Sequence, residues 1–422
     1  MNYSLKASIQ NATLYGLLYF SLLYCFIFTI VPYFSWFVIE LNIAKIIFSF
    51  VVIVVFAILL PYKFNKPSGL FLHLQFLLPI VPMLVMYGAS DLPTNYILMV
   101  ISAFVVVLFV KNLKFRPFFF TNLSIELLIS IFLILSYLAI SIEYISRGSI
   151  NFDITQIYNV RYINEQSNTS SLIIYFSSFA SNVFLPFSLI LSVRKKLISG
   201  IFFSILGSIL IFGLTNAKSA VFYPFMALFI YLFLSQDKPL RVMLLSTIFL
   251  VIFSIITFKE GDLFRIAITS LGVRRVFFEP SLINFYYYDF FSKNDFIFWS
   301  NSKLTFGLLD YPYNLDPAHL IGESYFGTSL TGANTGWLGS GLMQAGSFGV
   351  FLYAVSVGLI LAYLDSCRSY LSSKLIVSLT ICPMFVLFLS SDLLSSLLTH
   401  GVLLTIILLC FISIDAKHNE KY

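Results

Sequence analysis

Charged side chains are scarce in this 422-residue chain, at 10% of all residues, against about 25% in an ordinary soluble domain. Hydrophobic residues make up 59%, and the mean hydropathy is +0.93. This composition excludes a soluble globular domain and indicates an integral membrane protein. The apolar runs have the length of about 20 residues that a transmembrane helix needs, and they lack the alternation of membrane β-strands. We predict an all-α fold in a single membrane-embedded domain over residues 1–422.

Motifs for metal, redox, hydrolytic or nucleotide chemistry are also absent. The four cysteines form neither a CxxC motif nor a disulfide framework. No GxxxxGK[ST], HExxH, Asp-x-Asp or Gly-x-Ser-x-Gly motif occurs. We therefore expect no metal and no cofactor. The net charge of +6 does not indicate a nucleic-acid partner, because the basic residues concentrate in short joints between apolar runs.

Apolar runs predict about twelve transmembrane helices, separated mostly by short polar joints. Their approximate bounds are 12–34, 43–61, 69–88, 93–110, 122–145, 170–193, 197–214, 217–235, 240–258, 340–364, 374–391 and 397–414. The joints on one side carry most of the Lys and Arg residues, which places that side and both termini in the cytoplasm. The start of the chain has no small-residue cleavage pattern, so the first span is expected to remain as an anchor.

Two longer polar segments then face outward, residues 146–169 and residues 259–339. A polar segment as long as the second is usually functional when it lies between spans, so we expect the active-site region there. Ionisable residues inside the spans are expensive and are functional candidates by default. They are Glu143, Lys218, Asp392 and His400, with Asn182 deeper in. They gather near the outer ends of the spans instead of forming a path across the bilayer.

An arginine pair in the longer segment suits a pyrophosphate ligand. Residues 271–280 read Leu-Gly-Val-Arg-Arg-Val-Phe-Phe-Glu-Pro, which predicts a helix lying on the outer membrane surface with apolar anchors. The guanidinium groups of Arg274 and Arg275 present planar, bidentate donors to phosphate. The alternative is that both only bind lipid headgroups. Arg265 would point to the opposite side of a straight helix, so either Gly272 breaks the helix or Arg265 serves another purpose.

Further cations are candidates for phosphate contacts. Lys218 lies in Thr-Asn-Ala-Lys-Ser at the outer start of a span, where free N–H groups of the helix also favour anions. The alternative for a lysine at this position is simple extension to the membrane surface. Arg147 and Arg161, in the outer segment 146–169, are looser candidates.

His319 and Glu323 are the candidate acid–base residues. Asp316–Pro317 predicts a helix start, and His319 and Glu323 would share a face of that helix, although Gly322 weakens it. Such a group takes the proton from an attacking hydroxyl. The alternative is an ordinary polar pair at the surface, and Asp392 and His400 are reserve candidates for the base.

Three motifs lie between residues 214 and 365. They are the Thr-Asn-Ala-Lys218-Ser span opening, the Arg274-Arg275-x-Phe-x-x-Pro segment, and a glycine-rich run from Asn334 to Gly349 that starts a late span. Together with the topology of the whole chain, they resemble the Wzy-type oligosaccharide repeat-unit polymerases of bacterial surface polysaccharide synthesis. The glycines alone would indicate close helix packing. An arginine pattern described for the family, Arg followed sixteen residues later by Gly, is absent after each outer-facing arginine.

The resemblance implies a metal-independent glycosyltransferase of the bacterial inner membrane with a periplasmic active site. Its substrates would be undecaprenyl-pyrophosphate-linked oligosaccharides of an O-antigen or capsule. One glycan would be transferred en bloc to a second lipid-linked unit, with release of undecaprenyl pyrophosphate. Asn334 would then contact substrate with the cations, and the bilayer, a chain-length regulator and a flippase of the same pathway would be partners.

Two other functions remain open. An O-antigen ligase shares the architecture and differs in its acceptor, which is lipid A core. A lipid-linked oligosaccharide flippase or other transporter also fits twelve spans, but it would line a central path with polar side chains. The aromatic residues of the outer segment, including Trp299 and Trp337, could stack on sugars or form the interfacial belt of a membrane protein.

Overall fold

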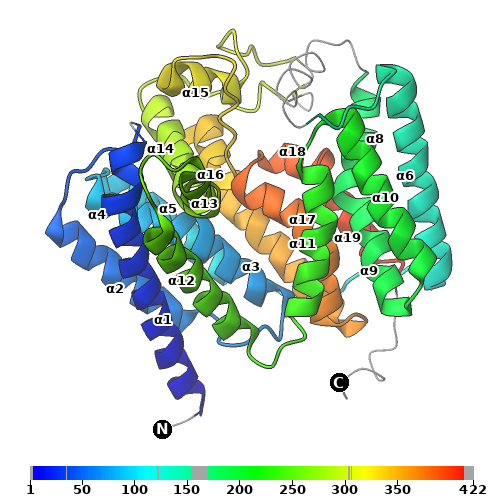
Figure 1. The fold of residues 1–422 in the computed structure, drawn as a ribbon, viewed down its shortest axis with the longest axis horizontal. Coiled ribbons are helices and arrows are strands. Elements are labelled where there is room, and N and C mark those ends of the chain that lie inside the picture. Colours follow the sequence, from blue (N-terminus) through cyan, green and yellow to red (C-terminus); the bar gives the residue numbers. More distant parts are fainter. Residues whose placement is uncertain are drawn as a thin grey trace. The chain divides into compact units, whose positions relative to one another are not determined.

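The chain is mainly helical, and no β-strand forms in the part that the computed structural model describes. That part comprises residues 3–34, 36–120, 123–153, 170–302, 305 and 307–412. The predicted all-α class is confirmed for these residues (Figure 1).

Among the described residues, seven helices are long and apolar enough to cross a membrane, which makes this a multi-pass membrane protein. They are Lys6–Tyr33, Pro67–Ala89, Ile125–Arg147, Leu172–Lys195, Ile198–Thr215, Pro239–Thr257 and Trp337–Ser369. Five shorter apolar helices are Ile43–Leu59, Thr94–Val110, Ser219–Phe233, Ser373–Leu389 and Leu393–Leu409. Each predicted span coincides with one of these helices. That all twelve cross the membrane, and that residues 259–339 face the periplasm, stay predictions.

Contacts divide the chain into two compact units, so the expected single domain stays a prediction. Unit 1 comprises Met1–Leu113, Asp237–Ala362 and Phe388–Leu393, and unit 2 comprises Lys114–Gln236, Tyr363–Leu387 and Leu394–Tyr422. The helices that start in unit 1 are α1 (Tyr3–Cys25), α2 (Ile43–Leu59), α3 (Pro67–Gln75), α4 (Val81–Ala89), α5 (Thr94–Val110), α12 (Pro239–Thr257), α13 (Leu263–Thr269), α14 (Glu279–Phe291), α15 (Pro317–Phe326), α16 (Trp337–Ser366) and α18 (Leu393–Leu398). Those that start in unit 2 are α6 (Ile125–Arg147), α8 (Ser171–Phe179), α9 (Leu185–Lys195), α10 (Ile198–Thr215), α11 (Ser219–Phe233), α17 (Ser373–Leu389) and α19 (Val402–Leu409).

Helix Pro67–Ala89 is the buried centre of unit 1, because 94% of its apolar stretch is buried inside the protein. Between α3 and α4 it widens into a π-helical segment, η3 (Phe76–Ile80). Pro79 lies in that segment and has no N–H to donate, so it disturbs the regular ladder and accounts for the widening. The carbonyl of Pro79 accepts a 3.1 Å hydrogen bond from the Ser281 hydroxyl, which joins the polar segment to the central helix.

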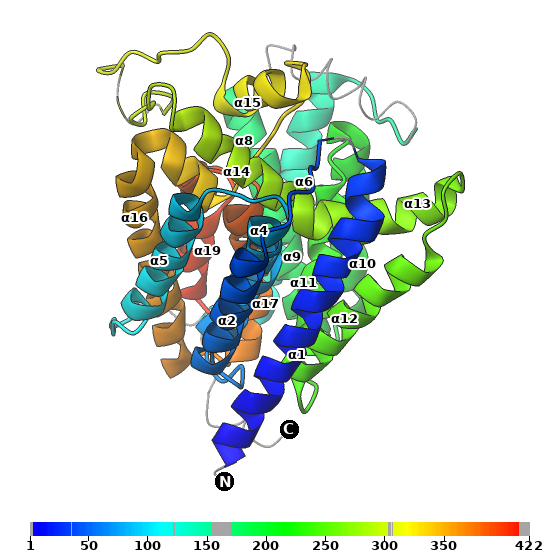
Figure 2. The same ribbon diagram turned by 90° about the vertical axis from the view of Figure 1, so that its left-hand side faces the viewer.

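The segment between α12 and α16 is an ordered, largely helical structure. It begins with α13, continues through a second π-helical stretch, η6 (Ser270–Phe278), and runs on into α14. The helix therefore passes through Gly272 without a break. α15 then packs against α14, above it in Figure 2. One apolar cluster packs α14, α15 and the start of α16 together. It consists of Tyr287, Phe291, Ile297, Ile321, Ala333 and Met343.

Helix α16 differs from the uninterrupted span predicted at 340–364. It starts at Trp337 and is broken at Ala345 and Gly346, whose φ/ψ angles are −159°/37° and 58°/−139°. Only glycine adopts the second conformation readily. Gly341 and Gly349 allow the two halves to approach, because a Cβ at either position would meet the backbone of the other half.

Unit 2 is a bundle in which α6, α9 and α10 pack together and α11 packs on α9 and α10. Small residues line the contact between α9 and α10. The Ser188 and Ser204 hydroxyls are 2.7 Å apart, and a Cβ on Gly200 would meet the Ser192 side chain. Close approach of small residues is the usual packing device of membrane helices.

Candidate functional site

Arg274 is buried and fully engaged within unit 1. Its Nη1 donates to the Glu279 carboxylate at 2.8 Å, and its Nε and Nη2 donate to the Ser270 hydroxyl at 3.1 and 2.9 Å. The guanidinium carbon also lies 4.5 Å from the centre of the Phe34 ring. Burial lowers the pKa of Arg274 below its ordinary value, and Glu279 offsets part of that effect. These contacts fix the π-helical segment in place and leave few donors for a ligand.

Arg275 is exposed beside it, and it makes no hydrogen bond or ion pair with any residue in the described ranges. The two adjacent arginines, which were predicted to play the same role, therefore have different environments, because Arg274 is buried and Arg275 is exposed. Arg265, at the start of α13, is half-exposed and lies 3.2 Å from the Asp262 carboxylate. Of the three, Arg275 is the one available to an anionic ligand.

His319 lies on α15, which runs through Gly322 without interruption. Its Nδ1 is 2.5 Å from the carbonyl oxygen of Ser329, and its Nε2 is 3.8 Å from the Asp316 carboxylate. Gly322 lets residues 328–331 pack against α15, because a Cβ there would meet the Thr331 carbonyl. The Ser329 contact fixes the orientation of the imidazole and leaves Nε2 as the nitrogen available for proton transfer.

Glu323 and Asn334 are both exposed. Glu323 follows His319 by four residues on the unbroken α15, so the predicted shared face is available to both side chains. Asp316 precedes α15 and Pro317 is its first residue, as predicted, but the Asp316 side chain makes no capping hydrogen bond. Asn334 lies just before α16.

The remaining predicted residues belong to unit 2. Lys218 is exposed and immediately precedes α11. Asn216, two residues earlier, has φ = 52° and is fully buried. The Arg147 guanidinium pairs with the buried Glu143 carboxylate, which also accepts a 2.6 Å hydrogen bond from Ser177.

Arg161 and His400 were also predicted as candidates in this part of the chain. Arg161 lies outside the described residues. The reserve base His400 has its Nδ1 3.4 Å from Nδ2 of Asn182, in the π-helical segment η5 (Ala180–Phe184). His400 therefore contacts the helices of unit 2 through this amide. The other reserve base, Asp392, belongs to unit 1.

A hydrogen-bonded chain at the break in α16 is the feature that sequence reasoning missed. The indole N–H of Trp299 donates to the Tyr353 hydroxyl at 2.9 Å, and Tyr353 donates to the Asp392 carboxylate at 2.8 Å. The Gln344 side chain accepts the Trp299 backbone N–H at 2.5 Å. Gln344, two residues before Gly346 inside an apolar run, was the signal for such a site, because broken helices at membrane depth occur where they line a site or cavity.

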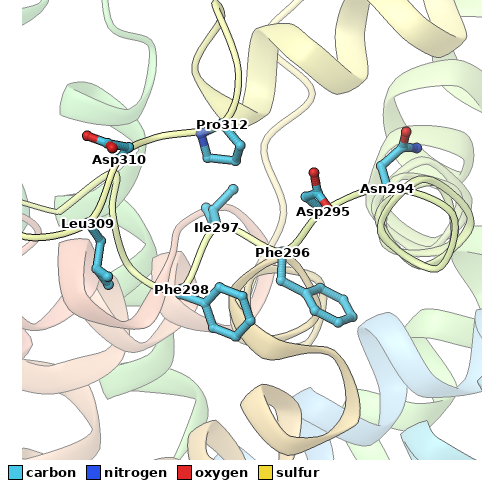
Figure 3. A pocket seen from close by; sticks show the side chains of 8 residues that line it. All are labelled: Asn294, Asp295, Phe296, Ile297, Phe298, Leu309, Asp310 and Pro312. Carbon is cyan, nitrogen blue, oxygen red and sulfur yellow. The ribbon is translucent and has the colours of Figure 1, made fainter.

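Two cavities flank this region of unit 1. One, of about 490 Å³, opens in the polar segment and is bordered by residues 294–298 and by Leu309, Asp310 and Pro312 (Figure 3). The other, of about 540 Å³, is an apolar groove between α5 and α16 that includes Ser347, next to the break. Within the described ranges, no three His, Cys, Asp or Glu side chains come together as metal ligands.

Comparisons with known proteins do not identify the chain. No family model matches it, and neither the curated proteins nor the solved structures give a significant match.

Proposed function

We propose that the protein polymerises undecaprenyl-pyrophosphate-linked oligosaccharide repeat units by en bloc glycosyl transfer, with release of undecaprenyl pyrophosphate. The observation that carries the proposal is the folded polar segment of unit 1. It combines an exposed arginine, a histidine–glutamate pair on one helix and a cavity lined by carboxylates and aromatic rings. Cation, proton acceptor and sugar-binding surface are the three components that transfer from a pyrophosphate donor requires.

Arg275 is the group proposed to bind the donor pyrophosphate. Its guanidinium has no competing protein partner among the described residues, and a bidentate charge-assisted contact stabilises the negative charge that develops on the leaving group. Arg274 is assigned a positioning role, because it holds the helix that carries Arg275. Lys218 in unit 2, preceding α11, is a second candidate for phosphate binding.

Glu323 or His319 is proposed as the base that takes the proton from the acceptor hydroxyl. Among the described residues, Nε2 of His319 has no strong hydrogen-bond partner, since the Asp316 carboxylate is 3.8 Å away, and Glu323 is exposed. Asp392 is the reserve candidate in the same unit, but its carboxylate already accepts the Tyr353 hydroxyl. The apolar groove between α5 and α16 provides the kind of surface on which a polyprenyl chain would lie.

The proposed orientation places both termini in the cytoplasm and the polar segment in the periplasm of a bacterium, across the inner membrane. Reporter fusions after Lys66 and Lys238 should give a cytoplasmic signal, and fusions at Asn168 and Lys303 a periplasmic one. A cytoplasmic signal at Lys303 would remove the polar segment from the side where lipid-linked glycans are assembled and would contradict the proposal.

The surface glycan of a deletion strain tests the reaction. A polymerase predicts single repeat units on lipid A core or on the cell surface, and restoration of long chains by the parent gene. Complete loss of attached glycan would favour a ligase instead, and accumulation of cytoplasm-facing lipid-linked units would favour a flippase.

A further inference from the structure

The cavity in the polar segment has an unusual lining for a site that serves a pyrophosphate substrate. Asp295 and Asp310 both border it, both are exposed, and neither carboxylate makes an ion pair or hydrogen bond with any described residue. In Figure 3 they lie on either side of Pro312. Two carboxylates without a cationic partner among the described residues repel phosphate, so this cavity disfavours the anionic end of a lipid-linked substrate.

The same lining suits a sugar. Carboxylate oxygens accept hydrogen bonds from hydroxyl groups, and charge-assisted hydrogen bonds of this kind are the stronger ones. The Phe298 side chain, at the edge of the cavity, is 51% exposed, so its ring has a free surface on which the apolar face of a sugar can stack. The volume of about 490 Å³ lies within the roughly 300–1,000 Å³ of small-molecule sites.

The backbone beneath the cavity is held rigidly in an unfavourable conformation. Phe298 and Trp299 have φ angles of 45° and 61°, a region that side chains other than glycine rarely occupy. The break in α16 frees the carbonyls of Met343 and Gln344, which accept the N–H groups of Ile297 and Phe298 at 2.9 and 3.0 Å. The backbone that carries the exposed Phe298 ring is therefore held in place by hydrogen bonds without a ligand, which lowers the entropic cost of binding.

The cavity and Arg275 lie at opposite ends of α14. Arg275 precedes that helix and Asp295 follows it, and its 13 residues span about 20 Å at 1.5 Å per residue. A ligand that touched both ends would be an extended chain with an anionic group at one end and hydroxyl groups at the other. This is the charge distribution of an oligosaccharide carried on a pyrophosphate.

We propose that this cavity is a glycan subsite that binds a sugar residue remote from the pyrophosphate, through Asp295, Asp310 and the Phe298 ring. The inference rests on the proposed function and extends it, because it assigns the recognition of the repeat unit to residues that take no part in phosphate binding. Residues 294–298 and 309–312 would then select among repeat units, and binding of pyrophosphate by Arg275 would not depend on which sugars the unit contains.

Binding of a lipid-free oligosaccharide to the detergent-purified chain tests the subsite directly. The probe is the repeat-unit oligosaccharide released by mild acid from the lipid-linked precursor of the parent strain, observed by saturation-transfer NMR. Asp295→Asn, Asp310→Asn and Phe298→Ala should each weaken binding by about 10-fold or more. Phe264→Ala, which removes a 76% exposed ring from α13, and Glu260→Gln are matched controls that should bind normally.

Three outcomes separate the subsite from the overall function. Weaker binding in the cavity variants, with binding retained in Arg275→Ala, supports the subsite. Normal binding in all three cavity variants overturns it, even if the deletion strain shows a polymerase defect. A deletion strain with an unchanged surface glycan overturns the proposed function and the subsite with it. Asp310→Asn changes an exposed side chain in irregular backbone, so at least this variant keeps the fold and the result interpretable.

Discussion

Substitution of the two adjacent arginines should have opposite consequences for stability and activity. Arg274→Ala removes hydrogen bonds to Glu279 and Ser270 and the contact with the Phe34 ring. Breaking a buried ion pair costs about 3–5 kcal/mol. Because Glu279 is 31% exposed and water can reach it, we expect a smaller loss of about 2–3 kcal/mol. Arg275→Ala removes an exposed side chain without a described partner and should change stability by less than about 0.5 kcal/mol.

Thermal unfolding in detergent measures the first effect and glycan chain length the second. A loss of 2–3 kcal/mol corresponds to a fall in Tm of about 4–12 °C for a unit of this size. For Arg275→Ala we expect an unchanged Tm and a decrease in polymerisation of roughly 10- to 150-fold, the value of a charge-assisted contact of about 1.5–3 kcal/mol. Polymerisation by Arg275→Lys should lie between that of the parent and that of Arg275→Ala, because lysine keeps the charge and loses the bidentate geometry.

Lys293→Ala is the matched control for an exposed cation at the far end of α14. It should leave chain length close to that of the parent, and it removes only an exposed ion pair with Asp289, which is worth about 0.2–1 kcal/mol of stability. Equal losses of stability for Arg274→Ala and Arg275→Ala, or normal chain length in Arg275→Ala, would refute the separation of roles.

Three further predictions concern other parts of unit 1. Gly346→Ala should cost about 1–3 kcal/mol of stability, because its backbone angles suit only glycine and a Cβ there would meet Phe296. Gly332→Ala should be neutral in the same thermal assay, because a Cβ there would make only an ordinary 3.6 Å contact with the Asn334 side chain. Loss of the base should lower polymerisation of purified repeat units by about 10²- to 10⁴-fold in either His319→Gln or Glu323→Gln, and near-normal rates in both would exclude these two residues as the base. Burial opposes ionisation of Asp289, but hydrogen bonds from Lys293 and Tyr325 outweigh this effect and hold the pKa of Asp289 below its usual range. The ionised Asp289 therefore contributes stability above about pH 4, and this contribution is lost as the pH falls further. The same Tm-versus-pH curve for the parent and for Asp289→Asn would contradict this prediction.

The positions of the helices could be predicted from the sequence because apolar runs of about 20 residues report directly on burial in a membrane. Each predicted span overlaps a helical segment with ends that differ by a few residues, and the last one, 397–414, overlaps the two helices α18 and α19. The helix start at Pro317 could be predicted for a similar reason, since proline fixes its own φ and lacks the N–H that a first helical position leaves unused.

The different environments of Arg274 and Arg275 could not be predicted. They depend on the π-helical register of η6 and on the ring of Phe34, some 240 residues earlier in the chain. Neither has a local signature in the sequence.

The break in α16 and the cavity were also missed in the sequence. The glycines at 346 and 349 indicate close packing, but they do not say that the carbonyls freed at the break accept hydrogen bonds from Ile297 and Phe298. The cavity joins residues 294–298 to residues 309–312 through irregular backbone, where periodicity gives no information. Asp295 and Asp310 are therefore identified only by the fold.

Polymerisation by the purified chain tests the central claim most directly. The protein, reconstituted in liposomes with undecaprenyl-pyrophosphate-linked repeat units and without nucleotide sugar or divalent cation, should convert them to a ladder of longer glycans and release undecaprenyl pyrophosphate in equal number to the bonds formed. Arg275→Ala protein, folded and with an unchanged Tm, should give mainly single units. Failure of the folded parent protein to extend the units in the presence of both substrates, or an unaltered ladder from Arg275→Ala, would contradict the account.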